Sequence, residues 1–330
     1  MSTITSTELS TLSYAKYGKT AVRVFRIVRE GKWHHIVEYN VAALLEGEIE
    51  TSYTKADNSV VVATDSNLAK ISPHILSAEK FAVHLGTFFV SKYAHIHKAH
   101  VDIEQLRWTR IEVPGEQKDV EEHSHAFWRD GEEKRTVSVV VDATAGKDKL
   151  TVSVSAGISG LLGDLPPVLK STGSAFEDFY RDEFTTLVPV DDRIFSTSVD
   201  LVYKFKPFAV TATKDEKKFE FDIPIKASAE GYDGSVWDES IPVKARKATL
   251  EVFALDESAS VQATLYKMGQ RIIAENQGVE EVTYTLPNQH YVPVDMRYIG
   301  VDNLTPCVVY SLTFTFSLFI SGSFVFYCGL

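Results

Sequence analysis

Alternation of apolar and polar side chains, repeated in separate short runs, is the feature that most restricts the fold of this chain. Residues 22–27 read Val-Arg-Val-Phe-Arg-Ile, and further strand-like runs occur at residues 33–45, 100–104, 150–154 and 281–286. Because successive side chains on a strand point to opposite faces, such runs predict strands with one face in the core. Residues 193–205 predict a longer strand, and Pro287 is expected to end the last run.

Helical spacing separates these runs. Apolar residues at helical spacing between Phe81 and Tyr93 predict one helix, and residues 241–255 predict a second. A third helix is expected to begin near Ser258 as its N-cap residue. Its buried face would consist of Val261, Leu265, Met268 and Ile272.

Turn signals complete this pattern. Asp130-Gly131 stands between residues 125–129 and 136–141, and this arrangement predicts a hairpin. Gly47 is expected at a turn or a bulge. Strands, then helix, then strands occur twice along the chain, which favours an α+β fold with an antiparallel sheet over a parallel one.

The repetition predicts an internal duplication with two structural units. We place the first unit at residues 14–146 and the second at residues 147–303, followed by an atypical apolar tail at 304–330. From Cys307 to Leu330 this tail carries no charged residue and is long enough to span a bilayer. Its Thr-Phe-Thr-Phe alternation at 313–316 nevertheless favours a strand over a transmembrane helix.

Charge and cysteine content exclude several classes of function. The formal net charge of -11 argues against nucleic acid or an anionic membrane surface as the main partner. An anionic small substrate would need a local cation. The only two cysteines are Cys307 and Cys328, so the body of the chain holds no disulfide framework and no cysteine-rich metal cluster. A reducing intracellular compartment is expected, and the N-terminal residues do not resemble a secretory signal.

Local motifs for cofactor chemistry are weak. Histidine pairs could each offer two metal ligands, but two ligands do not make a site, and histidines on a partly exposed sheet are the simpler interpretation. These pairs are His34-His35, His95-x-His97 and His123-x-His125. The chain has no glycine-rich phosphate loop and no G-x-S-x-G nucleophile elbow.

A set of longer strings carries more information, because many of them occur in one order along nearly the whole chain. They are Tyr17-Gly18-Lys19 and the segments 44–47, 53–59, 62–66, 169–176, 181–187, 192–193, 258–266 and 286–291. Taken together, from about Tyr17 to about Asp302, the chain resembles the urate oxidase family. The resemblance implies tandem tunnelling-fold units, with an antiparallel sheet, helices on its outer face and an oligomeric β-barrel tunnel.

The resemblance also implies a reaction. Members of the family are oxidoreductases that act on C–N bonds with oxygen as acceptor in purine degradation. They convert urate, dioxygen and water to 5-hydroxyisourate and hydrogen peroxide. No cofactor and no metal is implied, because the urate dianion supplies the electrons. An inactive or structural relative that binds a purine-like ligand without turnover is the alternative.

Three positions match the family's proton-relay network, namely Lys19, Thr64 and His290. A partly desolvated lysine can act as a base, and a hydroxyl can both donate and accept a proton. A histidine that titrates near neutrality can hold the water that completes the relay. Without the resemblance, Lys19 would be interpreted as an exposed strand-end lysine, Thr64 as a helix N-cap and His290 as a loop histidine.

Substrate binding is assigned by the same resemblance. Phe176 would stack on the flat purine, Arg193 would supply a bidentate cation, and Gln262 would bond another edge. Further contacts are expected from the N–H groups of Asp65 and Val261, from the Asn288 amide near dioxygen, and from Leu187 and Thr64 in the pocket. The plainer interpretations are core positions for Phe176 and Leu187, and an ion pair of Arg193 with Asp191 or Asp192.

The implied assembly is a homotetramer with active sites at subunit interfaces, because sheets from neighbouring chains would close their edges together. The family usually ends in a peroxisomal tripeptide. This chain ends Tyr-Cys-Gly-Leu, so the peroxisome is expected only from the resemblance, and the cytosol is the alternative. We interpret the tail as an altered terminus, with a membrane anchor as the minor alternative. A zinc-dependent pterin enzyme of the same fold is disfavoured by the absence of cysteine ligands in the body.

Overall fold

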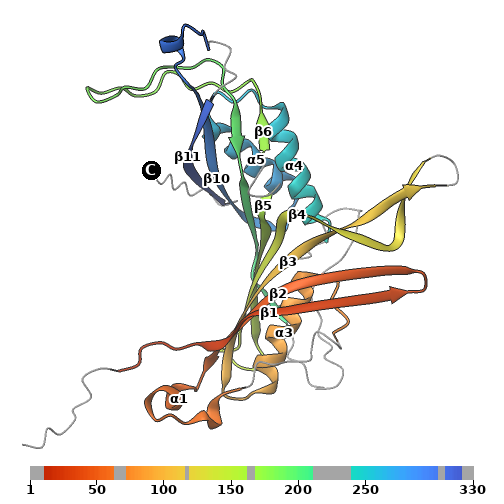
Figure 1. Ribbon diagram of the computed structural model, residues 1–330. Coiled ribbons are helices and arrows are strands. Elements are labelled where there is room, and N and C mark those ends of the chain that lie inside the picture. The colour runs from red at the N-terminus through yellow and green to blue at the C-terminus, as the bar shows by residue number, and fades with distance from the viewer. Residues whose placement is uncertain are drawn as a thin grey trace, which may run out of the picture.

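One antiparallel sheet runs through the chain (Figure 1). The computed structural model describes residues 11–62, 72–115, 119–161, 168–210, 239–303 and 309–321. Within these ranges the strands pair in the order β1-β2-β3-β4-β5-β8-β10-β7-β6, with β11 on β10 and β9 on β5. The strands are β1 Tyr17–Glu30, β2 Trp33–Gly47, β3 Ile96–Pro114, β4 Val120–Asp142, β5 Leu150–Leu161, β6 Val168–Lys170, β7 Phe195–Thr197, β8 Val199–Phe205, β9 Phe208–Val210, β10 Val279–Pro293 and β11 Val309–Ser321.

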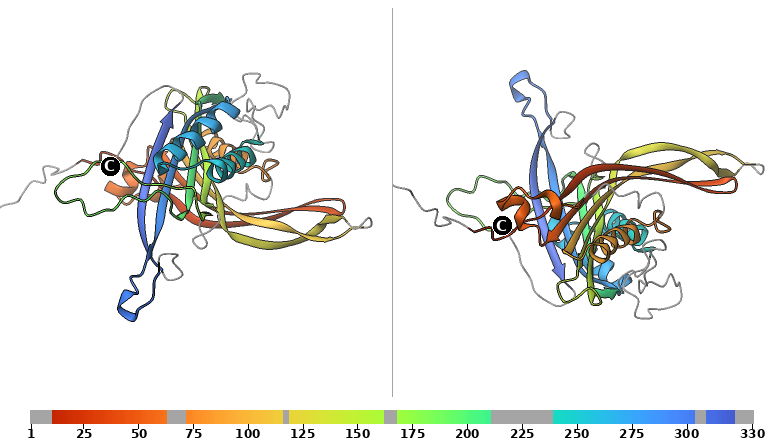
Figure 2. Two further views of the ribbon diagram at one scale, coloured as in Figure 1. Left: turned by 90° about the horizontal axis from the view of Figure 1, so that it is seen from above. Right: turned by 90° about the horizontal axis from the view of Figure 1, so that it is seen from below.

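The longer helices all lie on one face of this sheet (Figure 2). They are α3 Ala78–Lys92, α4 Ile241–Leu255 and α5 Val261–Glu275. Helix α3 packs on β3 and β4, α5 packs on β10, and α4 packs against α5. The shorter elements are α1 Glu50–Thr54 and the 3-10 helices η1 Asn58–Val60 and η2 Arg297–Ile299. The α+β class, the antiparallel sheet and the helix over 241–255 are confirmed.

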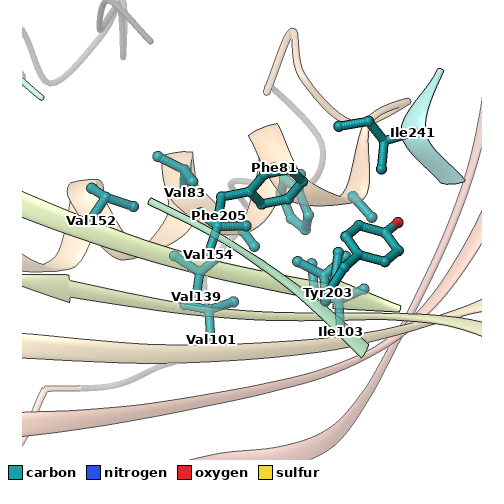
Figure 3. Close-up of a cluster of buried hydrophobic side chains, with 14 of the residues drawn as sticks. Phe81, Val83, Val101, Ile103, Val139, Val152, Val154, Tyr203, Phe205 and Ile241 are labelled. Atoms are coloured by element: carbon teal, nitrogen blue, oxygen red, sulfur yellow. The ribbon is translucent and has the colours of Figure 1, made fainter. Parts of the chain in front are cut away.

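The core lies between this sheet and the helices (Figure 3). On β2 the alternate residues from Val37 to Leu45 are buried, which confirms the alternation seen in the sequence. Helix α3 approaches β4 so closely that a Cβ added at Gly86 would lie 2.6 Å from the Val141 side chain. Glycine at this position therefore sets the distance between helix and sheet.

A buried ion pair joins the same two elements. Nη2 of Arg135 on β4 lies 2.5 Å from both carboxylate oxygens of Glu79 on α3. The Glu79 side chain is only 4% exposed. Removing one partner of such a pair leaves an uncompensated charge in the core, so the pair holds α3 in a single orientation on the sheet.

The predicted hairpin at Asp130-Gly131 is wrong. Residues 120–142 form one strand, β4, and both parts of it pair with β3. The register shifts between Leu106 and Trp108 opposite this point, and Gly131 has a φ of 69°. The glycine thus serves a bulge in a long strand, because β3 extends far enough to supply partners on both sides of it.

Three other boundaries differ from the prediction. Ser260, not Ser258, caps α5, since its side chain accepts from the N–H of Ala263 at 3.1 Å. Strand β10 continues through Pro287, which lies where its partner changes from β8 to β7 and a missing donor is tolerated. The predicted strand 193–205 is broken at Ser198 into β7 and β8 for the same change of partner.

The tail contributes a strand, as its alternation predicts. Strand β11 pairs antiparallel with β10 from Glu281↔Ser321 to Pro293↔Val309. In the described part of the chain, no helix has the length and apolar composition needed to cross a membrane. Cys307 and Cys328 lie outside the described residues.

The proposed boundary between the two units lies at residues 146 and 147, in the turn between β4 and β5. Because β5 pairs directly with β4, the sheet continues across this point. Gly47 coincides with a register shift between β2 and β3, which confirms the expected bulge. The division into units 14–146 and 147–303 stays a prediction.

A buried histidine makes the stability of this fold depend on pH. His84 on α3 is 0% exposed, and its Nδ1 lies 2.9 Å from Oγ of Ser72. Burial lowers the pKa of His84 from 6.5 to about 4. Below pH 6.5 the His84 side chain binds a proton in the unfolded chain, but in the folded chain it does not do so until about pH 4. The free energy of unfolding therefore decreases as the pH is lowered from 6.5 to about 4.

Between pH 6.5 and pH 5 the unfolding free energy of the unmodified chain should decrease because of His84. We predict that this decrease is smaller by about 2 kcal/mol in the variant His84→Gln, which lacks the titrating group. Urea unfolding at constant protein concentration measures the difference. The exposed control His125→Gln should follow the unmodified chain. Parallel pH dependences of the His84 variant and the unmodified chain would contradict the prediction.

Candidate active site

The start of β1 holds Lys19 beside a bulge. Lys19 pairs with Ala43 of β2, and the register then shifts before Val22. Ala21, inside this bulge, has a φ of 57°, which residues other than glycine rarely adopt. Bulges turn side chains in new directions, and strained backbone gathers at functional sites. The Lys19 side chain is exposed on a strand that forms one end of the described sheet.

The segment that leads to Thr64 is attached to the same strand. The Val62 N–H donates to the Tyr17 hydroxyl at 2.5 Å. Tyr17 stands two residues before Lys19, and Val62 stands two residues before Thr64. The structure therefore joins the residue two positions before Lys19 to the residue two positions before Thr64. Thr64 and Asp65 themselves lie outside the described residues.

Phe176 and Arg193 lie together and are called the cradle below. The Arg193 guanidinium carbon lies 5.1 Å from the centroid of the Phe176 ring. Phe176 exchanges two backbone hydrogen bonds with Val190, at 2.6 and 2.9 Å. The Arg193 N–H donates to the Ser174 carbonyl at 2.8 Å, and Nε of Arg193 donates to Oγ of Ser174 at 3.4 Å. The guanidinium thus lies over the Phe176 ring, which also stacks with the Phe179 ring at a centroid distance of 4.9 Å.

The cation of the cradle is not neutralised by its acidic neighbours in sequence. Within the described residues, Arg193 makes no ion pair with Asp191 or Asp192. The Asp192 carboxylate instead accepts from the Thr172 hydroxyl at 2.7 Å and from the Gly173 N–H at 2.8 Å. Burial lowers the pKa of Arg193, but a guanidinium stays charged at neutral pH. Its charge is available to an anion.

The N-terminus of α5 adds hydrogen-bond donors. Ser260 caps the helix by accepting from the Ala263 N–H. Helix geometry leaves the first amides, those of Val261 and Gln262, without partners inside the helix. The Gln262 side chain is exposed, whereas the Val261 side chain is buried at 3% exposure. One end of a helix therefore offers backbone N–H groups and a carboxamide.

Backbone pairing ties this helix end to the cradle. The Ser258 N–H donates to the Gly173 carbonyl at 2.9 Å, and the Ser258 carbonyl accepts from the Ala175 N–H at 2.9 Å. Ser258 and Ser174 therefore form a parallel bridge. Of the predicted substrate-binding residues, the structure brings together Phe176, Arg193, Val261 and Gln262.

Leu187 lies on the loop between Phe176 and Val190, whose backbones are hydrogen-bonded to each other. Its side chain is 53% exposed. Other large apolar side chains on this loop are more exposed still, with Tyr180 at 92%, Phe184 at 81% and Val188 at 70%. An exposed apolar loop of this kind is typical of a surface that another molecule covers.

Asn288 and His290 lie on β10, whose backbone the structure describes at these positions. Asn288 pairs with Thr197 of β7 on one side and with Phe314 of β11 on the other. His290 pairs with Leu312 of β11. Strand β7 begins two residues after Arg193, so β10 runs beside the strand that continues from the cradle.

Lys19 and the cradle lie at opposite ends of the sheet. Six strand-to-strand steps separate β1 from β10 in the order β1-β2-β3-β4-β5-β8-β10. At about 4.8 Å a step, the two strands are roughly 29 Å apart along the sheet. Along the sheet of a single copy, Lys19 is therefore separated from the cradle and from His290 on β10.

The contacts beneath the cradle escaped the sequence analysis. Asp256, Ser258, Thr264 and Ser174 link the cradle to α5, although the strings 169–176 and 258–266 contain three of them. A cluster of serine, threonine and aspartate at a helix start was the available signal, because such residues cap helices and bond to nearby backbone. The sequence alone did not show what they join.

The histidine pairs have ordinary partners. His97 Nε2 lies 3.2 Å from a carboxylate oxygen of Glu48. The rings of His34, His123 and His125 pack against one another, with centroids 4.4 to 5.5 Å apart. Across the described ranges, no group of three or more histidine, cysteine, aspartate or glutamate residues could hold a metal ion.

Comparison with known proteins decides the family. A sequence profile named Uricase matches residues 15–140 and 154–307. The chain is 43% identical over 298 residues to the uricase of Aspergillus flavus, covering 88% of each chain. It is 42% identical over 313 residues to the uricase of Schizosaccharomyces pombe, covering 92% of this chain and 94% of that one. The chain belongs to the uricase family.

The fold is also that of uricases. The crystal structure of uricase from Arthrobacter globiformis superposes with a TM-score of 0.74 at 28% identity, covering 96% of this chain and 98% of that one. Membership in the uricase family confirms the resemblance found in the sequence and decides against the zinc-dependent pterin enzymes. The matched region ends at residue 307, so β11 follows it.

For this uricase-family chain we predict that Tyr17→Phe lowers the unfolding free energy by about 1–2 kcal/mol, because the buried Val62 N–H loses its acceptor. Urea unfolding and hydrogen exchange of the Val62 amide measure the effect. Tyr14→Phe is the matched control, since the Tyr14 hydroxyl is exposed and bonds Glu46 at 2.6 Å. Equal stability and equal Val62 exchange in both variants would contradict the prediction.

Proposed function

We propose that this chain is a urate oxidase, which converts urate, dioxygen and water to 5-hydroxyisourate and hydrogen peroxide. Two electrons pass from urate to dioxygen, and water supplies the added hydroxyl. The cradle carries the proposal, because an aromatic ring beside an unneutralised guanidinium suits a flat anion. Relatives named uricase at 42–43% identity favour turnover over the inactive alternative.

The cradle and the helix end would hold the substrate by its ring and its edges. Phe176 stacks on the purine, and Arg193 donates to a carbonyl and ring-nitrogen edge. Gln262 and the N–H of Val261 bond another edge, and the Asp65 N–H completes the contacts. The net charge of -11 would repel an anion, so the Arg193 cation provides the local attraction.

Proton transfer is assigned to Lys19, Thr64 and His290. Urate must lose a proton before it can donate electrons to dioxygen. Lysine, threonine hydroxyl and histidine can pass that proton through a bound water. Asn288 would face the dioxygen or water, and Leu187 would line the pocket. The protein contributes orientation and deprotonation, and the reaction draws its electrons from urate itself.

The active site is proposed to form between two chains of a homotetramer. The roughly 29 Å between β1 and β10 along the sheet exceeds the size of a purine, so Lys19 of one chain needs the cradle of another. The end strand β1 and the exposed apolar loop 177–189 provide surfaces for such an assembly. Closing sheet edges against one another would form the predicted tunnel.

The direct test is turnover. Purified protein should remove the ultraviolet absorbance of urate while it consumes one dioxygen and forms one peroxide per urate. Lys19→Met should lower kcat by about 10²–10⁴-fold, the usual range for loss of a general base. Assembled protein that leaves urate unchanged would overturn the assignment.

Mixing of variants tests the two-chain site. We predict that Lys19→Met and Arg193→Met are each nearly inactive and that co-produced mixed assemblies recover about a quarter of the unmodified activity, the random-pairing value for a symmetric oligomer. The matched control mixes Arg193→Met with Gln262→Leu. Both defects then lie on the same side of every site, so no recovery is expected. Mixed assemblies as inactive as either parent would contradict a site shared between chains.

A further inference from the structure

A series of linked, buried polar side chains adjoins the cradle and has no part in the proposed proton transfer or substrate binding. Ser174 is 1% exposed, Ser258 is 2% exposed and Thr264 is 1% exposed. Polar groups buried to this degree destabilise a protein unless they are hydrogen-bonded. Their hydrogen-bond partners therefore identify the segments that these side chains connect.

Thr264 lies at the centre of this series of polar side chains. Its hydroxyl lies 2.6 Å from Oδ2 of Asp256 and 2.8 Å from Oγ of Ser258. A hydroxyl has one hydrogen and a carboxylate only accepts, so the Thr264 hydrogen goes to Asp256 and Ser258 donates to Thr264. Lys267 donates to the other oxygen of Asp256, and Lys170 donates to its backbone carbonyl.

The charge on Asp256 strengthens these bonds. Burial by itself raises the pKa of the Asp256 carboxyl, but hydrogen bonds from Lys267 and Thr264 outweigh burial and lower it. Asp256 is therefore an anion at neutral pH. A charged acceptor makes shorter and stronger hydrogen bonds than a neutral one, and a bonded chain polarises along its length.

The other end of this series of polar side chains contacts the cradle. Ser258 pairs through its backbone with Gly173 and Ala175 on either side of Ser174. Ser174 in turn accepts from the backbone N–H of Arg193 and lies 3.4 Å from its Nε. Side-chain hydrogen bonds thus run from Asp256, at the end of α4, through Thr264 in α5 to Ser258. Backbone pairing of Ser258 with Gly173 and Ala175 then holds Ser174, whose hydroxyl accepts from Nε of Arg193.

We propose that Asp256 and Thr264 are positioning residues for purine binding, which set the separation between the cradle and the donors at Val261 and Gln262. The inference rests on the proposed function. Thr264 and Gln262 are two residues apart on one helix, whereas Phe176 and Arg193 lie on a separate loop. The Ser258 pairing, the Thr264 bonds and the bond from Lys170 to the Asp256 carbonyl connect the two. Purine edges need donors placed within a fraction of an ångström, and small displacements of a binding group weaken binding strongly.

The test compares two substitutions of the same kind. Thr264→Val removes the hydroxyl at nearly constant volume, and Thr249→Val does the same at a buried threonine that bonds Ala245 and Tyr284 in α4 and β10. Thr249 is also 1% exposed, and its hydroxyl bonds residues of α4 and β10 in place of the Asp256 and Ser258 partners of Thr264. Both variants should lose stability, so a change confined to Thr264→Val reports positioning.

The measurements are steady-state kinetics with urate and the dissociation constant of urate without dioxygen. Thr264→Val should raise both KM and this constant about tenfold while kcat changes less than about threefold, the pattern of lost uniform binding. Thr264→Ser should restore the values to within about twofold, because it keeps the hydroxyl. If Thr264→Val fails to assemble, Asp256→Asn replaces it, because this variant keeps an acceptor but loses the charge. It should raise KM and the dissociation constant of urate by a smaller factor, again with little change in kcat.

Two outcomes overturn the inference. Either Thr264→Val folds and assembles with the unmodified KM, or Thr249→Val raises KM as much as Thr264→Val does. In both cases the unmodified chain still oxidises urate, so the proposed function stands. Failure of the unmodified chain to bind or oxidise urate would overturn the proposed function instead.

Discussion

Backbone pairing across a single antiparallel sheet is the constraint on which the rest of this structure depends. Each strand is held at a fixed spacing from its neighbours, so the strand order determines how many strand spacings separate two strands across the sheet. That order puts β1, with Lys19, at one end and β10 with the cradle near the other. The helices cover only one face. The proposed assembly of several chains would bring these two ends together.

The cradle places a cation at an aromatic ring in a protein whose formal net charge is -11. Within the described residues Arg193 makes no ion pair with Asp192, whose carboxylate accepts from Thr172 and Gly173 instead. Nε of Arg193 donates to Ser174, whereas the Asp256 carboxylate accepts from Thr264 and Lys267 of α5. Local geometry, not net charge, decides what the site attracts.

Much of the fold could be predicted from residue patterns. The strand over 33–45 and the helix over 241–255 follow from periodicity, because a half-buried element must repeat its apolar residues with its own period. The predictions at Asp130-Gly131 and Pro287 were wrong for a shared reason. Glycine and proline mark backbone irregularity, but whether it becomes a turn or a bulge depends on partner strands distant in sequence. The site residues came from resemblance, and their roles stay predictions.

The sequence by itself determined the α+β class, the buried faces of β2 and α5 and the uricase family, because these depend on short-range periodicity and on strings of residues. Only the tertiary structure decided that Phe176 and Arg193 meet, that Ser258 joins them to α5, and that Lys19 lies six strands away from β10. The physical reason is that long-range pairing and burial select one partner among many that the local pattern allows, and no local pattern encodes that choice.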